Sequence, residues 1–445
     1  MAGGIFKAGV SEIRPGVYIN MKSGRQVVYA GNNSGVVVLP LIGHTYGPKG
    51  FIEISCVDPS ASKPLLGYDV EDNAGAMLFV REALKNAFTV FAYNLCEGTK
   101  ATATVSGVTV TAKYGGTRGN DLKVVFKANV ADQTAFDCYV YLANSLVEKF
   151  TAVKTIDDLK AEKSEYIDFS GEGDITSENA GTNLAGGTNG TSKNEDFTEF
   201  LDECEQIVFD TIAFPISDTS LKTAAITKIK YLNDDMGKYV IGVVANQAAD
   251  NYNVINVTNG VVLEDGTEVS AIAATAYVAG ARAKAGYKNS LTGAEYDGAV
   301  SIINKKSHEE AKISLKNGEF FFTFDDTGAV CCESDINSLV TIGEDMDKTY
   351  RKNKVIAIAY AIFRSIKAQF KESEYANTEN GWSQMQGAGA AVLIQYQNDN
   401  VIESVDTTND FVIDKAKSSG DETYVTIGFK SVDSAEKIYI TAITR

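Results

Sequence analysis

The chain has 445 residues, of which 44% are hydrophobic and 22% are charged, a composition typical of folded proteins with about two to four domains. Asp and Glu outnumber Lys and Arg by 58 to 41, and the resulting net charge of −17 disfavours binding to nucleic acid or to a membrane surface. No apolar run approaches the roughly 20 residues of a membrane-spanning helix, and we expect no secretory signal. A soluble, cytosolic protein is therefore expected.

The sequence offers little material for catalysis. His44, in a glycine-rich turn, and His308, in a charged segment, are the only histidines, and their surroundings are more typical of structural or surface positions than of a general base. Cys331 and Cys332 are neighbours on a predicted strand, where they would point to opposite faces instead of sharing a metal. Gly387–Ala391 resembles a broken dinucleotide fingerprint, but no strand precedes it, which favours close packing of a helix through small residues. We predict no catalytic residue, no cofactor, no metal and no enzyme.

In chain order, the first predicted element is a short strand within an N-terminal arm, residues 1–26. Val17, Ile19 and Met21 alternate there on one face, without a local partner strand. Residues 27–96 form the first part of an α/β core. Its expected elements are a buried strand at 36–41, a helix at 72–86 and a strand at 88–93.

The composition changes between residues 97 and 196, which predict an inserted antiparallel β-sandwich and a linker. Threonine and valine alternate from 102 to 112, and apolar strands are expected at 122–126 and 138–142. A tract rich in Gly, Asn, Thr and Ser from 170 to 196 is the strongest linker candidate in the chain.

Strands and helices alternate again in residues 197–340, which favours a layered, mainly parallel α/β domain. Its expected elements are strands at 206–214, 239–245 and 253–257 and helices at 221–237 and 268–285. Residues 341–435 form a C-terminal α+β domain, and residues 436–445 form a C-terminal arm. The elements expected in this part are helices at 348–375 and 380–397 and strands at 411–416, 424–429 and 437–443.

Two features exceed what an ordinary globular chain requires. The first is a run of cations without an acid, Lys348, Arg351, Lys352, Lys354, Arg364, Lys367 and Lys371. This run is either the solvated face of an ordinary helix or a docking surface for an acidic partner. The second is a strand at each terminus, which must pair elsewhere in the chain or with another copy. Reciprocal exchange between copies propagates as a helix or tube when it does not close a ring.

Several stretches resemble contractile-tail sheath proteins, above all those of Gram-positive myophages, defective prophages and phage-tail-like bacteriocins. In the family's order they are Arg14–Ile19, Gly35–Leu41 with Gly47 and Pro48, Tyr114–Leu122, Tyr277–Gly280 with Ser290–Thr292, and Ile336–Thr341 before Lys352–Ile356. The resemblance covers nearly the whole chain. It implies a subtilisin-like α/β domain without a protease site, an inserted outer β-sandwich and a C-terminal domain that faces a tail tube.

The resemblance also implies roles for individual residues. The extended terminal arms would exchange strands with neighbouring subunits through Val17, Tyr18, Ile19, Ile438, Tyr439, Ile440 and Thr441. The seven cations between Lys348 and Lys371 would face the tube. At Ile358-Ala359-Tyr360 the chain departs from the charged residues expected in relatives, which leaves open which face of this helix meets the tube.

The function that the resemblance implies is mechanical. Subunits would polymerise as stacked six-membered rings around a tail tube, and contraction would drive the tube through a bacterial envelope. Expected partners are further copies of the chain, the tail tube protein, and baseplate and tail terminator proteins, without nucleic acid or direct membrane binding. Assembly is expected in the bacterial cytoplasm, and the protein would end in the tail sheath of a virion or bacteriocin particle. The alternatives are the sheath of a secretion-like contractile injection system and, in a different class, a small-molecule-binding α/β enzyme.

Overall fold

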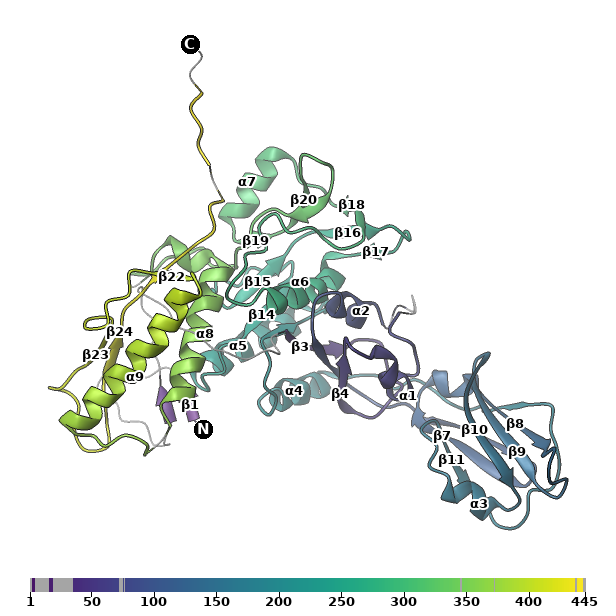
Figure 1. Ribbon diagram of the computed structural model, residues 1–445. Coiled ribbons are helices and arrows are strands. Elements are labelled where there is room, and N and C mark those ends of the chain that lie inside the picture. The colour runs from purple at the N-terminus through teal and green to yellow at the C-terminus, as the bar shows by residue number, and fades with distance from the viewer. Residues whose placement is uncertain are drawn as a thin grey trace. The chain divides into compact units, whose positions relative to one another are not determined.

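The computed structural model describes residues 2–4, 16–18, 35–71, 75, 77–344, 346–371, 373–436 and 438–442. The protein has a mixed α/β fold with several separate sheets, and it divides into two compact units (Figure 1). The first, which we call the α/β unit, holds residues 1–38, 82–88 and 205–445. The second, which we call the two-sheet unit, holds residues 39–81 and 89–204.

A parallel sheet forms the core of the α/β unit. β13 (Thr211–Ala213) pairs in parallel with β14 (Ile241–Ala245) and with the first residues of β3 (Val36–Leu41). On the other side of β14, β15 (Val254–Val257) and β19 (Glu319–Phe320) continue the sheet, also in parallel. All side chains of β13, β14 and β15 are buried, as expected for parallel strands covered on both faces. The predicted layered α/β arrangement is therefore confirmed in outline.

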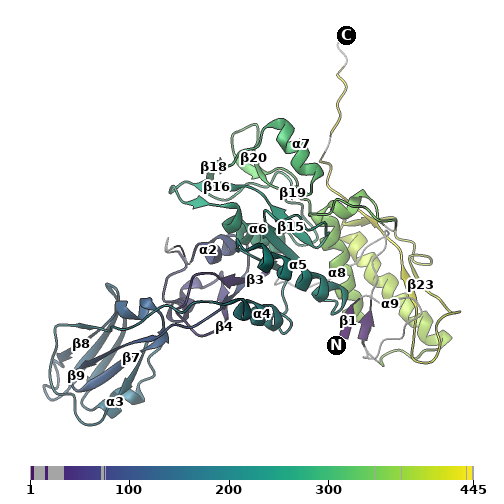
Figure 2. The same ribbon diagram turned by 180° about the vertical axis from the view of Figure 1, so that it is seen from behind.

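Two helices pack on this sheet, α5 (Thr219–Asp234) and α6 (Ala271–Ala285) (Figure 2). The carboxylate of Asp218 caps the first turn of α5 by accepting a hydrogen bond from the backbone N–H of Leu221 at 2.9 Å. In α6, Gly280 allows a close helix approach, because a Cβ there would lie 2.4 Å from the carbonyl oxygen of Ala83. The helix predicted from residue 268 begins three residues later, since residues 268 and 269 pair as a strand.

The remaining short elements of this part of the chain form smaller antiparallel sheets. β16 (Gly260–Leu263) lies between β17 (Glu268–Val269) and β18 (Ala299–Ile303), and β20 (Phe322–Phe324) pairs with β21 (Val330–Cys332). The α/β unit also contains α7 (His308–Lys316) and the last three residues of α2 (Leu78–Leu84). Of the helix predicted at 72–86, only the portion from residue 78 is helical among the described residues.

The C-terminal part is built on two neighbouring helices, α8 (Asn353–Gln369) and α9 (Glu379–Asn398). The prediction of α9 is confirmed within one residue at each end. The prediction of one helix from 348 to 375 is wrong, because a 3₁₀ turn, η3 (Lys348–Arg351), precedes α8 and Lys352 between them is extended. Four short strands follow in two antiparallel pairs, β22 (Ile402–Glu403) with β25 (Lys430–Ser431) and β23 (Phe411–Ile413) with β24 (Val425–Ile427).

The small residues of α9 allow close packing, as the sequence indicated. A Cβ on Gly389 would lie 2.3 Å from the ring of Phe411 in β23. The glycine therefore lets α9 pack closely against an aromatic side chain of the neighbouring strand, which agrees with the predicted close packing of this helix through small residues. The helix has no charged residue between Glu379 and Asp399.

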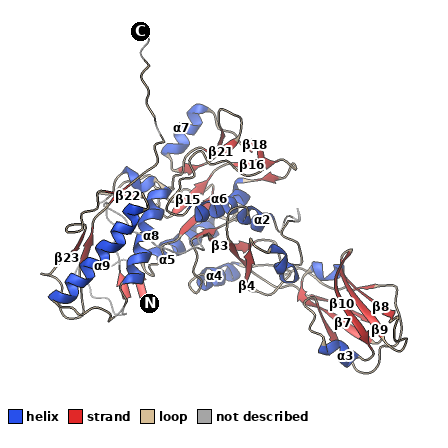
Figure 3. Ribbon diagram, viewed as in Figure 1, coloured by secondary structure: helices blue, strands red, loops and turns tan. Residues whose placement is uncertain are grey.

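Two antiparallel sheets share one core in the two-sheet unit (Figure 3). One has the strand order β10-β9-β8-β12 and the other β11-β7-β6. The bounds of these strands are β6 (Lys100–Val105), β7 (Val108–Gly115), β8 (Leu122–Ala128), β9 (Phe136–Leu142), β10 (Ser145–Val153), β11 (Ile167–Ser170) and β12 (Thr182–Asn183). The unit also contains β4 (Gly50–Ser55), β5 (Thr89–Asn94), η1 (Pro59–Ser62), α1 (Lys63–Leu66), η2 (Thr117–Asp121), α3 (Ile156–Ala161) and α4 (Asn194–Glu203).

Much of the tract from 170 to 196 packs against these sheets and is not a free linker. β12 lies within it and pairs with β8, and Leu184 is buried in the shared core. Backbone bridges join Ala185 to Thr102 and Thr188 to Thr99. The polar composition suggested a linker, but hydrogen bonds between backbone groups, which composition does not report, hold the tract in place.

Candidate assembly surfaces

The C-terminal arm is the most exposed apolar segment that the structure describes. Ile438, Tyr439 and Ile440 are 74%, 90% and 85% exposed. Residues 438–442 pair with no strand among the described residues, so the strand predicted at 437–443 is not formed over its described part; residues 437 and 443 lie outside the described residues. The physical reason is that a strand needs a partner for its backbone N–H and C=O groups, and the described parts of this chain offer none to the arm.

The N-terminal arm is described at six residues. β2 (Gly16–Tyr18) pairs in parallel with β1 (Ala2–Gly4), with Val17 opposite Gly3 and Tyr18 opposite Gly4. The expectation that this strand has no local partner is therefore wrong for the single chain. Ile19, the third residue named for strand exchange here, lies outside the described residues.

Arg364, one of the seven cations between Lys348 and Lys371, forms an ion pair and hydrogen bonds within the chain. Its guanidinium donates to the carboxylate of Asp210 at 2.7 Å and to the carbonyl oxygen of Tyr239 at 2.7 Å. The same carboxylate accepts hydrogen bonds from the backbone N–H groups of Gly35 and Val36 at 3.0 and 3.1 Å. Arg364 therefore ties α8 to the start of β3 and to the segment before β13.

Four more of these cations have partners within the α/β unit. Arg351 donates to the carbonyl oxygen of Leu315 at 2.5 Å, and Lys367 donates to that of Gly237 at 3.3 Å. Lys354 is buried and donates to the hydroxyl of Ser434 at 3.3 Å. Lys352 forms an ion pair with the carboxylate of Glu436. Lys348 and Lys371 are exposed, and no described residue bonds to their side chains. The seven cations thus do not form one continuous free surface.

A buried ion pair that the sequence did not predict lies beside the start of α8. Arg282 of α6 donates to Asp335 at 2.6 Å, and each side chain is 1% exposed. The Asp335 carboxylate also accepts from the backbone N–H of Leu291 at 3.0 Å and from the Asn353 side chain at 2.8 Å. The backbone N–H of Asp335 donates to the Thr292 hydroxyl at 2.8 Å. Asp335 therefore joins α6, the loop after it and the first residue of α8.

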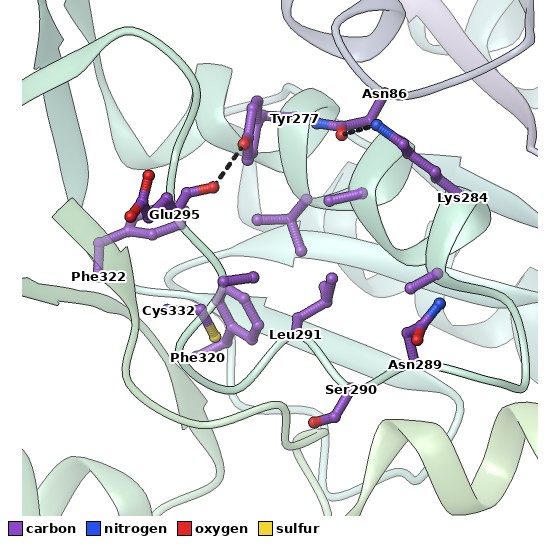
Figure 4. Close-up of a pocket in the computed structure, with 14 residues that line it drawn as sticks. Asn86, Tyr277, Lys284, Asn289, Ser290, Leu291, Glu295, Phe320, Phe322 and Cys332 are labelled. Atoms are coloured by element: carbon purple, nitrogen blue, oxygen red, sulfur yellow. Dashed lines mark hydrogen bonds between the residues drawn. The ribbon is translucent and has the colours of Figure 1, made fainter. Parts of the chain in front are cut away.

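A cavity of about 230 Å³ lies beside α6, and Figure 4 shows its lining. Apolar side chains such as Leu291, Phe320 and Phe322 make up much of the wall. The hydroxyl of Tyr277 donates to the carbonyl oxygen of Glu295 at 3.1 Å, so it is engaged in positioning the backbone (Figure 4). Burial raises the pKa of the Cys332 thiol well above its usual value, which keeps it protonated. This lining supplies neither an activated nucleophile nor a histidine base, so it gives no support to the enzyme alternative.

The two histidines and the two adjacent cysteines occupy structural positions in the fold. His44 is buried, and desolvation lowers its pKa to about 4, so the ring is neutral at pH 7. His308 begins α7 and is exposed. Cys331 and Cys332 follow each other in β21, and no group of three His, Cys, Asp or Glu side chains within the described ranges could hold a metal ion. Across those same ranges, no helix has the length and apolar character needed to span a bilayer.

The apolar side chains exposed at Ile438, Tyr439 and Ile440 are typical of a surface that another protein chain covers, as in a self-associating structural protein. Family models agree and match most of the chain. The phage tail sheath β-sandwich domain matches residues 96–189, the central domain matches residues 190–338, and the C-terminal domain matches residues 345–445. The chain belongs to the phage tail sheath family, and its function is that of a structural subunit of a contractile sheath.

Individual relatives are similar over almost their full length. The chain is 37% identical to the phage-like element PBSX protein XkdK of Bacillus subtilis, with 99% of both chains covered. The solved sheath tail protein of Desulfitobacterium hafniense is 35% identical, with a TM-score of 0.82, covering 96% of this chain and 99% of that one. The contracted helical sheath of the anti-feeding prophage is 12% identical, with a TM-score of 0.55, covering 98% of this chain and all of that one; this similarity shows the fold alone.

Proposed function

We propose that the chain polymerises helically, as stacked six-membered rings around a tail tube, and that contraction drives the tube through a bacterial envelope. A baseplate would lie at one end of the polymer and a tail terminator protein at the other. The polymer would assemble in the bacterial cytoplasm. The observation that carries this proposal is the C-terminal arm, whose Ile438, Tyr439 and Ile440 expose their apolar side chains. An isolated chain gains nothing from this exposure, whereas a strand added to a neighbour's sheet would bury these side chains and pair their backbone.

Each terminal arm adds a strand to a neighbouring subunit in this proposal. On the N-terminal side Val17, Tyr18 and Ile19 take part, and on the C-terminal side Ile438 to Thr441. The short parallel pairing of β2 with β1 would be exchanged for pairing with a neighbour on assembly. The arms then keep subunits connected while the bodies move during contraction. The energy for contraction is stored in the extended lattice at assembly, so no nucleotide is required.

Contact with the tube uses the cations of the C-terminal domain that remain available. Lys348 and Lys371 are the best candidates among the seven, because their exposed side chains are bonded to no described residue. The other five cations bond to partners within the chain, so they stabilise this surface instead of contacting the tube. They are Arg351, Lys352, Lys354, Arg364 and Lys367. We also retain the six-part division at 1–26, 27–96, 97–196, 197–340, 341–435 and 436–445, with a subtilisin-like core lacking a protease site.

The experiment is negative-stain electron microscopy of the full chain at high concentration, beside a variant lacking residues 1–21. Striated hollow cylinders are expected from the full chain, because exchanged arms connect its subunits. The shortened variant is expected to stay monomeric with an unchanged far-ultraviolet circular dichroism spectrum. Unchanged cylinders from the shortened variant would contradict the role of the N-terminal arm. A full chain that stays monomeric even with added tail tubes would contradict the proposed function.

A further inference from the structure

We propose that Glu436 anchors the C-terminal arm to the body and so sets how far the arm can reach. The anchor is a clamp of three side chains, Glu436, Lys352 and Thr292, which we call the arm-root clamp. This inference rests on the proposed function, because the reach of the arm matters only if the arm joins neighbouring subunits. The clamp itself is a property of the single chain and can be measured there.

The clamp holds both oxygens of one carboxylate. Oε1 of Glu436 accepts a hydrogen bond from the Thr292 hydroxyl at 2.7 Å, and Oε2 is paired with the ammonium group of Lys352. The side chains of Glu436 and Lys352 are 14% and 23% exposed, so water screens this ion pair less than it screens a surface pair. Two residues beyond the clamp, Ile438 is already 74% exposed. The boundary between the body and the arm therefore lies at Glu436.

The clamp is attached to a buried, hydrogen-bonded part of the body. The Thr292 hydroxyl that donates to Glu436 also accepts from the backbone N–H of Asp335 at 2.8 Å. Asp335 in turn holds Arg282 and Asn353. Lys352 directly precedes α8, and Ser290, which also donates to Oε1 of Glu436 at 3.5 Å, lies in the same loop as Thr292. All three partners of Glu436 therefore belong to the set of segments that the buried Asp335 carboxylate joins. The direction in which the arm leaves is thereby coupled to α6 and α8.

Releasing Glu436 would lengthen the free arm. The next backbone hydrogen bond upstream is donated by Val432 to the carbonyl oxygen of Val401 at 3.0 Å, and Lys354 bonds to Ser434 between the two. Residues 435 and 436 would then join the arm and add about 7 Å at roughly 3.3 Å per extended residue; if the contact at Ser434 also opens, residues 433–436 join it and add about 13 Å. A longer flexible tether lowers the effective concentration of the arm at its acceptor, so assembly needs more protein.

The clamp can be tested by the rate at which trypsin cuts after Lys437 in the full chain. The variant is Lys352→Met, which removes the cation and leaves the sequence around the cut unchanged. Cleavage requires the residues on both sides to enter the protease in extended form, so its rate follows the population with Glu436 released. We expect release of the peptide that begins at Ile438 to become about two- to fivefold faster, the range typical of partly exposed ion pairs.

Two further variants separate the clamp from a general loss of structure. Lys352→Arg keeps the cation and is expected to restore the wild-type cleavage rate. Glu403→Gln removes the exposed ion pair with Lys430 in the nearby β22–β25 sheet and is expected to leave the rate unchanged. Equal cleavage rates in Lys352→Met, Lys352→Arg and the wild type would overturn the proposal.

Assembly provides the second reading. In pelleting assays, Lys352→Met is expected to raise the concentration at which polymer appears by about twofold, because the longer arm finds its acceptor less often. Faster cleavage with an unchanged polymerisation threshold would overturn the link between the clamp and the reach of the arm. A wild-type chain that never polymerises would contradict the proposed function, and the cleavage assay would still decide whether the clamp exists.

Discussion

Helix α8 and the C-terminal arm are similar in apolar content but differ in how far their side chains are buried. Both are rich in apolar residues, yet Ile358 of α8 is completely buried whereas Ile440 of the arm is 85% exposed. Polar side chains of α8 bond within the chain, as Arg364 does to Asp210 and Asn353 does to Asp335. Beyond Glu436, no described residue supplies such partners to residues 438–442 of the arm. The comparison indicates that α8 stabilises the subunit and that the arm stabilises the assembly.

The largest expected effect breaks the α8 side of this comparison. Asp335→Ala would leave the Arg282 guanidinium buried without its carboxylate and would remove the acceptor of Asn353. We expect the free energy of unfolding to fall by about 3–5 kcal/mol, as when one member of a buried ion pair is deleted. Urea titration followed by fluorescence measures the change. A loss below about 1 kcal/mol, the size expected for the exposed Glu403→Gln, would show that the pair is not holding the body together.

A matched pair of truncations sharpens the comparison. Ile358→Ala removes a completely buried side chain from α8 and is expected to cost about 2–4 kcal/mol, because it leaves a cavity. Ile438→Ala makes the same chemical change on the arm and is expected to alter the stability of the monomer by less than about 0.5 kcal/mol. Both are measured by thermal and urea unfolding of the monomer. Equal losses at the two sites would mean that the arm packs on its own subunit.

The smallest expected effects come from comparing the stability changes caused by replacing two cations of the same region, Arg364 and Lys371. Arg364→Met removes the partner of Asp210 and is expected to cost about 1–2 kcal/mol, whereas Lys371→Met is expected to change stability by less than about 0.5 kcal/mol. Co-sedimentation with tail tubes then tests the surface role with the double variant Lys348→Glu/Lys371→Glu. We expect weaker binding with unchanged unfolding. Wild-type binding by the double variant would remove these two lysines from the proposed tube contact.

Local signals in the sequence were sufficient for several elements. Helix α9 follows Thr378, whose hydroxyl accepts from the backbone N–H of Gly381, and its bounds were predicted within one residue. The buried strands β13, β14 and β15 were also predicted, because parallel strands covered on both faces read as continuous apolar runs. The family resemblance rested on such stretches and is confirmed by the family models.

Long-range pairings account for what the sequence could not predict. Arg282 and Asp335 are 53 residues apart, and no spacing rule connects them. The break at Lys352 depends on backbone hydrogen bonds on both sides of it: Asn337 donates to the carbonyl oxygen of Arg351, and Asn353 donates to that of Asp335. The seven cations between Lys348 and Lys371 were predicted to share one surface, because a sequence shows where charges lie but not which acceptors they bond to. Five of the seven bond to acceptors within the chain. The strand predicted in the C-terminal arm requires a partner that the described parts of this chain do not supply.

The central claim is that the apolar side chains of the arm serve neighbouring subunits and not their own. The most direct measurement is sedimentation and negative-stain microscopy of the double variant Ile438→Asp/Ile440→Asp beside the wild type, with thermal unfolding of both monomers. The account predicts a variant with the wild-type melting temperature that forms no cylinders, because charged side chains would be buried when the arm adds to a neighbour's sheet. Cylinders that form at wild-type concentrations, or a monomer that loses stability, would contradict it.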